Sequence, residues 1–196
     1  MDIVNLEPAA RKLADLVVRV DDGQLASPTP CPAYTVGDLI DHVGGMALAF
    51  TAAANKAGGP HAEMQGSGDA SRLGDDWRSR IPRDLVALAR AWREPGAWQG
   101  MTRIAGMDTP AEMAGLSVAD ELAVHGWDLG RATSQPYDCD QAVLDAAHSF
   151  LGQFASPDAP AGPRVPFGPP RPLPVGAPLL DRVVALAGRD PDWAPR

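Results

Sequence analysis

The chain has 196 residues, of which 20 are glycine and 20 are proline, so the sequence excludes one long helical array. Its length and its 45% of hydrophobic residues indicate one folded domain with a core rather than a disordered chain. The formal net charge of −8 repels phosphate backbones and anionic lipid, so neither nucleic acid nor a membrane surface is an expected partner.

The sequence also argues against membrane insertion and export. Its longest weakly polar run, roughly Val43 to Ala54, is too short to cross a bilayer, and Met1–Asn5 lacks the basic stretch of a secretory signal. The two cysteines, Cys31 and Cys139, are too few for a disulfide framework and fit a reducing compartment. We therefore expect a cytoplasmic protein.

Apolar residues at helical spacing predict a first helix from about Leu6 to Val20. The proline-rich segment Ser27–Pro32 predicts an extended connector. A second helix should open at Thr35, whose hydroxyl can cap the backbone N–H of Asp38. On this helix His42 lies at the edge of an apolar stripe made of Leu39, Val43, Met46 and Phe50.

The middle of the chain alternates between loop-like and helical composition. Residues 58–74 are rich in glycine, serine and alanine without periodicity, which predicts a mobile loop. A third helix is expected from about Asp75 to Arg93. Residues 98–107 alternate weakly and predict either a short hairpin or an extended connector.

Two further helices are expected in the last third of the chain. The first should have Thr109 as its cap and Pro110 as its first helical residue, and should continue to about Ala132. The next should run from Cys139 or Asp140 to Phe154.

The C-terminal part of the sequence is rich in proline. Residues 156–177 contain eight prolines, which predicts an irregular or polyproline II-like segment along the surface of the helices. A last short helix is expected over Pro178–Ala187, with enough apolar surface to dock back. We therefore expect residues 1–155 to form a metal-binding helical bundle, and residues 156–196 to pack on it within the same domain.

The strongest local signal for chemistry is the pair Glu121 and His125. These residues are four apart in the predicted fourth helix, so their side chains project from one face about one turn apart and can hold a single cation. The alternative is a carboxylate that hydrogen-bonds an imidazole without any metal.

His42 adds a third ligand if the second and fourth helices lie side by side. Two imidazoles and a carboxylate form a set that suits Zn²⁺, and three protein ligands leave a position for water or substrate. The alternative for His42 is a buried neutral imidazole bonded to a backbone carbonyl. Asp38 also lies four residues from His42, but its place in the first helical turn favours capping.

Asp128 lies three residues past His125 on the same helix face, where it can orient an imidazole N–H or a substrate. A solvated charge on the helix surface is the equal alternative. The sequence contains no GxGxxG after a strand, no P-loop and no GxSxG elbow, so nucleotide-binding and serine-hydrolase functions have no support.

Two blocks of sequence, residues 29–45 and 121–129, together resemble a known family. They are similar to the signature blocks of actinobacterial proteins related to the N-terminal domain of mycothiol-dependent maleylpyruvate isomerase, within the DinB/YfiT-like superfamily. The C-terminal segments Val165–Pro170, Leu180–Arg182 and Gly188–Pro191 resemble a small stand-alone subfamily of this group.

The resemblance implies a four-helix bundle that binds a divalent metal, with zinc first and nickel as an alternative. The first histidine of the family falls on His42, and its Glu-x-x-x-His pair falls on Glu121 and His125. In the isomerase the metal is thought to activate the thiol of mycothiol. The isomerase carries a separate C-terminal domain where this sequence has a proline-rich tail and a short helix, so the resemblance supports the metal site more than maleylpyruvate isomerisation itself.

Three functions stay open from the sequence. The leading hypothesis is a metal-dependent thiol transferase or isomerase, in which His42, Glu121 and His125 hold the ion and a small thiol such as mycothiol attacks a small electrophile. The second is a hydrolase in which Asp128 is the general base for metal-activated water. The third is a non-catalytic bundle that binds a metal or ligand. Because relatives often pair, a homodimer is a further expectation.

Overall fold

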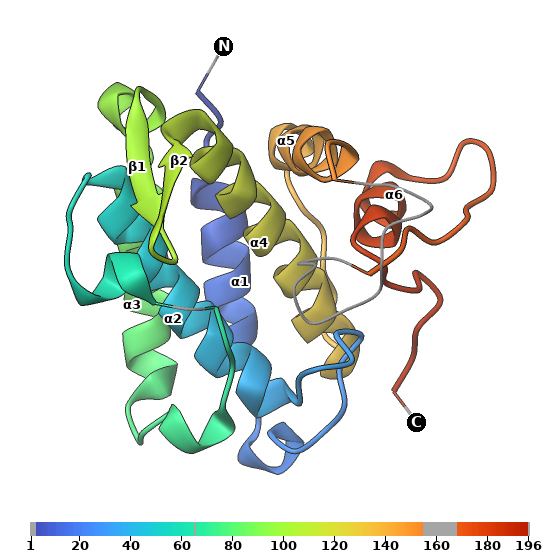
Figure 1. Cartoon of the computed structure of the whole chain (residues 1–196). Helices are drawn as coiled ribbons and strands as arrows, with labels where there is room; N and C mark the ends of the chain where they lie inside the picture. The colour runs from blue at the N-terminus through green and yellow to red at the C-terminus, as the bar shows by residue number, and fades with distance from the viewer. Residues whose placement is uncertain (1–2, 65, 155–167, 196) are drawn as a thin grey trace.

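The structure is a computed structural model, and it describes residues 3–64, 66–154 and 168–195. Within those ranges the chain forms six α-helices and one small antiparallel sheet of two strands (Figure 1). The helix-dominated fold predicted from the sequence is confirmed. In the same ranges, no helix is both long enough and apolar enough to span a bilayer.

Four helices surround the main core. Helices α1 (Glu7–Val18) and α2 (Val36–Ala54) each pack against both α3 (Trp77–Ala91) and α4 (Ala111–Ala132). All four helices contribute fully buried side chains, among them Leu13, Leu39, Ile40, Ile81, Leu85 and Leu122. Burial of each such side chain contributes about 1.5–3 kcal/mol, so the inward faces with helical spacing determine this packing.

Helix α2 begins as predicted, with a reciprocal cap. The backbone N–H of Asp38 donates to Thr35 Oγ1 at 3.2 Å, and the backbone N–H of Thr35 donates to Asp38 Oδ2 at 2.9 Å. The other carboxylate oxygen of Asp38 accepts from the backbone N–H of Ala70 at 2.8 Å. One residue therefore both caps α2 and fastens the following loop to it.

Residues 58–74 contain more local structure than the sequence indicates. Two short 3-10 turns, Pro60–Glu63 and Ala70–Arg72, interrupt the loop. Asp41 of α2 accepts hydrogen bonds from the backbone N–H of Asp69 and from the Arg72 guanidinium. Turns of three or four residues are too short to produce a periodic pattern, which is why the sequence indicates only a loop.

The strands β1 (Met101–Ile104) and β2 (Met107–Pro110) form a hairpin, which decides between the two predicted alternatives and extends three residues beyond the predicted segment. Its two turn residues, Ala105 and Gly106, both have positive φ, as two-residue hairpin turns require. The hairpin lies against α2 and α4, and the Thr102 hydroxyl donates to the carbonyl of Ala53 in α2 at 2.7 Å.

The predicted start of α4 is wrong by one residue, and Thr109 does not cap the helix. Thr109 and Pro110 belong to β2, where they pair with Thr102 and Met101, and the Thr109 hydroxyl donates to the Met107 carbonyl rather than to the helix. Pro110 has φ −55° and ψ 130°, an extended conformation that its ring also permits. The helix therefore begins at Ala111, directly after the strand.

Helices α5 (Gln141–Gly152) and α6 (Leu179–Leu186) lie on the other side of α4 from the hairpin (Figure 1). α5 packs on α4, and α6 packs on both. The side chain of Asp140 accepts from the backbone N–H of Ala142 and caps α5, which decides between the two predicted starts. Residues 168–177 form neither helix nor strand, as expected, and the rest of the proline-rich segment before them lies outside the described residues.

Candidate metal centre

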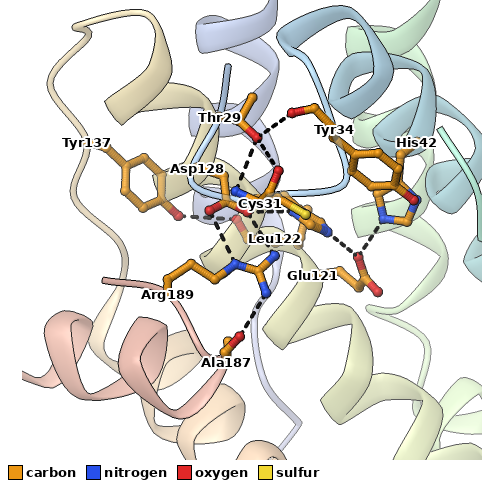
Figure 2. A network of polar contacts seen from close by, with 11 residues as sticks. Thr29, Cys31, Tyr34, His42, Glu121, Leu122, Asp128, Tyr137, Ala187 and Arg189 are labelled. Carbon is orange, nitrogen blue, oxygen red and sulfur yellow. Dashed lines mark hydrogen bonds and ion pairs between the residues drawn. The ribbon is translucent and has the colours of Figure 1, made fainter. Parts of the chain in front are cut away.

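The neighbouring helices α2 and α4 bring His42, Glu121 and His125 together (Figure 2). Glu121 Oε2 lies 3.1 Å from His42 Nε2 and 3.2 Å from His125 Nε2. One potential ligand atom from each residue lies within 4.8 Å of the other two. The i, i+4 spacing on α4 and the inward face of α2 thus bring these three side chains close to one another.

The two ring nitrogens of His42 differ in whether they have a hydrogen-bond partner. The side chain is 9% exposed, its Nε2 faces Glu121, and its Nδ1 is buried and has no partner among the described residues. A backbone carbonyl, the partner that the alternative interpretation of the sequence required, does not bind either nitrogen in this part of the chain. Tyr34 stacks beside the ring, with 5.4 Å between ring centroids.

Asp128 supports the triad from behind. His125 Nδ1 lies 3.0 Å from Asp128 Oδ2, and Asp128 is 0% exposed. Burial alone would raise the pKa of Asp128, but the charge of Arg189 and the hydrogen bond from His125 outweigh burial and lower it. Asp128 is therefore ionised. It does not line the cavity described below.

The donor chemistry fits a cation among the three side chains. Because ionised Asp128 can only accept, His125 Nδ1–H must donate to it, and a neutral His125 then presents its Nε2 lone pair to Glu121 Oε2. Two acceptors 3.2 Å apart repel each other unless a proton or a metal ion lies between them. The Asp128 and Glu121 carboxylates overcome the effect of burial and raise the pKa of His125 to about 10, so without metal the proton stays. A metal ion would displace it.

Glu121 is held as a carboxylate by the same contacts. Burial alone would raise its pKa, but hydrogen bonds from His125 and His42 offset this and leave the pKa well below the ordinary value. An ionised Glu121 is the state that a metal ligand requires.

Arg189 is a site residue that the sequence analysis missed. Its guanidinium donates from Nη2 to Asp128 Oδ2 at 3.1 Å and from Nη1 to the Ala187 carbonyl at 2.9 Å (Figure 2). It follows α6 and is separated from Asp128 by 61 positions in the sequence. Its only signal was its place in the block Gly188–Pro191.

A cavity of about 670 Å³ opens beside the triad. Its polar side includes Cys31, Tyr34 and Asp120 as well as the triad and Arg189. Asp120 is 2% exposed, and its Oδ1 has no partner among the described residues; burial raises the pKa of this carboxyl well above its ordinary value. The rest of its lining is mostly apolar and includes Met46, Phe50, Met64, Ile104, Met107 and Phe150.

Two other candidates lie elsewhere. Asp38 caps α2 as predicted. Among the described residues, no hydrogen bond joins Asp38 to His42. His148 on α5 pairs with Arg182 at 2.9 Å and does not line the cavity. Asp38 therefore serves the helix cap, and His148 serves the contact between α5 and α6.

Comparison with known proteins identifies the family. The model of the family described as "Mycothiol maleylpyruvate isomerase N-terminal domain" matches residues 6–130 of this chain. The chain belongs to this family. The matched residues include the whole triad and Asp128, whereas Arg189 lies beyond them. The resemblance drawn from the two sequence blocks is confirmed.

Relatives and solved structures agree with this assignment. Uncharacterized proteins from two strains of Mycobacterium tuberculosis are each 32% identical in an alignment of 190 residues that covers 90% of this chain and 91% of theirs. The crystal structure of the mycothiol-dependent maleylpyruvate isomerase superposes with a TM-score of 0.59 at 18% identity, covering 79% of this chain and 71% of that one. Its H52A mutant gives 0.58 at 18% identity, covering 76% and 67%. At this identity the likeness concerns the fold.

Proposed function

We propose that this protein is a metal-dependent enzyme of the thiol-transferase or isomerase type. His42, Glu121 and His125 would hold one divalent cation, with zinc first and nickel as the alternative. The observation that carries the proposal is the convergence of their three donor atoms within 4.8 Å beside a cavity of about 670 Å³. Three protein ligands leave a coordination position for a small-molecule thiol.

The cation would supply the charge that lowers the pKa of a thiol, and a thiolate is the nucleophilic form. The residues of the chain would do the positioning. Asp128 accepts the His125 Nδ1–H, which turns Nε2 toward the cavity, and Arg189 neutralises Asp128. Because Asp128 is fully buried behind His125, we propose that it is a positioning residue and not the general base.

The thiol that we propose is mycothiol or a related low-molecular-weight thiol, because the description of the family names mycothiol. The likeness to the isomerase structure also supports assigning α1 to α4 to a four-helix bundle of the DinB/YfiT-like type. We further propose that residues 156–196 complete the same domain and that the protein forms a homodimer.

A thiol-dependent turnover assay tests the proposal. Wild-type protein reconstituted with zinc should accelerate the reaction of mycothiol with an electrophile, and His125→Ala should lose both this acceleration and the bound zinc. His148→Ala is the matched control, because this histidine pairs with Arg182 away from the triad. Equal rates for wild type and His125→Ala would exclude the proposed role.

One observation favours the second candidate, a hydrolase that uses metal-activated water. Asp120 lines the cavity next to Glu121, its Oδ1 has no partner in the described part of the chain, and burial raises its pKa, so this carboxyl is placed to donate a proton to a leaving group. Turnover of an ester without any added thiol, lost in Asp120→Asn, would favour hydrolysis over thiol transfer.

A further inference from the structure

We propose that the cavity selects a neutral electrophile with an apolar body over one that carries carboxylates. This inference rests on the proposed function and names the substrate class of the same site. It follows from two properties of the cavity lining: the composition of its apolar part, here called the wall, and the balance of charge in its polar part, here called the floor.

The wall consists of apolar side chains from three separate parts of the fold. Met46 and Phe50 come from α2, Ile104 and Met107 from the hairpin, and Phe150 from α5. A pocket of about 670 Å³ has the size of a small-molecule site, and such sites take most of their binding energy from apolar contact. The part of the substrate away from the reacting atom would therefore lie against this wall.

The wall is held in place by its own contacts. The Thr102 hydroxyl fastens β1 to the Ala53 carbonyl of α2, and the backbone N–H of Gly106 donates to the Ala62 carbonyl at 3.0 Å. Arg103 pairs with Glu63 at 2.7 Å on the outer side of the same hairpin. The hairpin thus presents Ile104 and Met107 to the cavity as a fixed surface.

The floor offers no free positive charge to an anionic substrate. Among the described residues that line the cavity, Arg189 is the one arginine or lysine, and its charge is already paired with Asp128. Asp120 and Glu121 add carboxyl groups on the same side. A divalent cation at the triad would be balanced by Glu121 and by the thiolate, so a substrate carboxylate would lose its hydration in the cavity without a free cation to pair with.

The transfer step is balanced with the thiol and the electrophile alone. For an aryl chloride, the thiolate sulfur attacks the ring carbon that carries chlorine and forms the carbon–sulfur bond. The carbon–chlorine bond then breaks, chloride leaves with the bonding electron pair, and the proton of the thiol passes to solvent. No oxidant or reductant is consumed.

Two probes that differ by one carboxylate test the inference. The rates of mycothiol with chlorodinitrobenzene and with chlorodinitrobenzoate are measured on the zinc-loaded protein, each divided by its uncatalysed rate. We expect the neutral compound to be favoured by about tenfold or more, since the carboxylate would be partly desolvated without a free cation to pair with. Equilibrium titration with the unreactive dinitrotoluene and dinitrotoluate should give the same order of affinity and needs no turnover.

A pair of surface variants locates the preference. Met107 is 65% exposed and lines the cavity, whereas Met101 is 57% exposed on the same hairpin and does not line it. Met107→Lys places a cation at the rim and should reduce the preference for the neutral compound by about threefold or more, while Met101→Lys should leave it unchanged. Since both side chains are exposed, both variants are expected to fold.

The outcomes separate the two proposals. Equal or better acceleration of the carboxylate, or equal effects of the two lysine variants, would overturn the inference while thiol transfer stands. Absence of zinc-dependent acceleration with either compound overturns the proposed function, and the titration then still measures whether the cavity discriminates against a carboxylate.

Discussion

Arg189 donates to both oxygens of Asp128, the carboxylate that holds His125, so a cation that follows α6 supports a ligand in the middle of α4. The distances are 3.4 Å and 3.1 Å, and both residues are buried. A buried ion pair of this kind is costly to break from one side, because the remaining charge has no partner.

Replacing Arg189 should therefore destabilise the fold. We expect Arg189→Met to lower the free energy of unfolding by about 3–5 kcal/mol, since buried Asp128 loses its guanidinium partner and keeps only the contact with His125. The double variant with Asp128→Asn should cost clearly less than the sum of the single changes. Urea unfolding at neutral pH measures all three, and strict additivity would contradict the pairing.

Asp128→Asn should weaken metal binding without removing any ligand. A neutral amide accepts the His125 Nδ1–H more weakly than a carboxylate does. Mutation of a residue that hydrogen-bonds a metal ligand typically lowers metal affinity by about 10- to 100-fold. Competition with a chromophoric chelator measures the zinc affinity. Asp84→Asn is the control, because Asp84 is also buried but pairs with Arg83 on α3, away from the cavity. An unchanged affinity in Asp128→Asn would remove its positioning role.

Zinc should stabilise the folded protein through the triad. At about 100 times its dissociation constant, a ligand specific for the folded state adds about 2.7 kcal/mol, which corresponds to a Tm increase of roughly 5–10 °C for a chain of this size. Thermal unfolding with zinc and with chelator measures this difference. His42→Ala should abolish it and His61→Ala, in the 3-10 turn Pro60–Glu63, should retain it. A zinc effect of the same size in His42→Ala would show that the ion binds elsewhere.

The cap of α2 should make stability depend on acid pH. Hydrogen bonds from the Thr35 hydroxyl and from the backbone N–H groups of Ala70 and Thr35 lower the pKa of Asp38. The carboxylate therefore stabilises the fold above the pKa of the unfolded chain, about 3.9, and this contribution is lost as the pH falls through the lower pKa of the folded state.

We expect Asp38→Ala to cost about 0.5–2 kcal/mol at neutral pH, and this cost should shrink in strong acid. Urea unfolding of both proteins across the acid range measures the difference. A cost that stays constant from neutral pH to about pH 2 would show that the charge of Asp38 does not contribute.

The triad could be predicted because each of its parts is local. Glu121 and His125 share a face through helical spacing, and His42 lies on the apolar face of a helix whose cap is visible in the sequence. Only the adjacency of α2 and α4 needed tertiary structure, and the family resemblance supplied that.

The missed features depend on long-range packing. Arg189 reaches the site because α6 docks on α4 and α5, and no periodicity records where the chain then passes. Asp120 looks like one charge among several on α4 until burial leaves one of its oxygens without a partner in the described residues. Thr109 and Pro110 carry the composition of a helix start, but pairing with β1 decided their conformation.

The three candidate ligands lie within residues 6–130, the stretch that matches the family, whereas Arg189, which supports His125 through Asp128, lies outside it. Family members that differ beyond this shared stretch would then tune the same three ligands through different distal segments. Exchanging C-terminal segments between such relatives is thus a route to altering metal affinity and reactivity while every coordinating side chain stays the same.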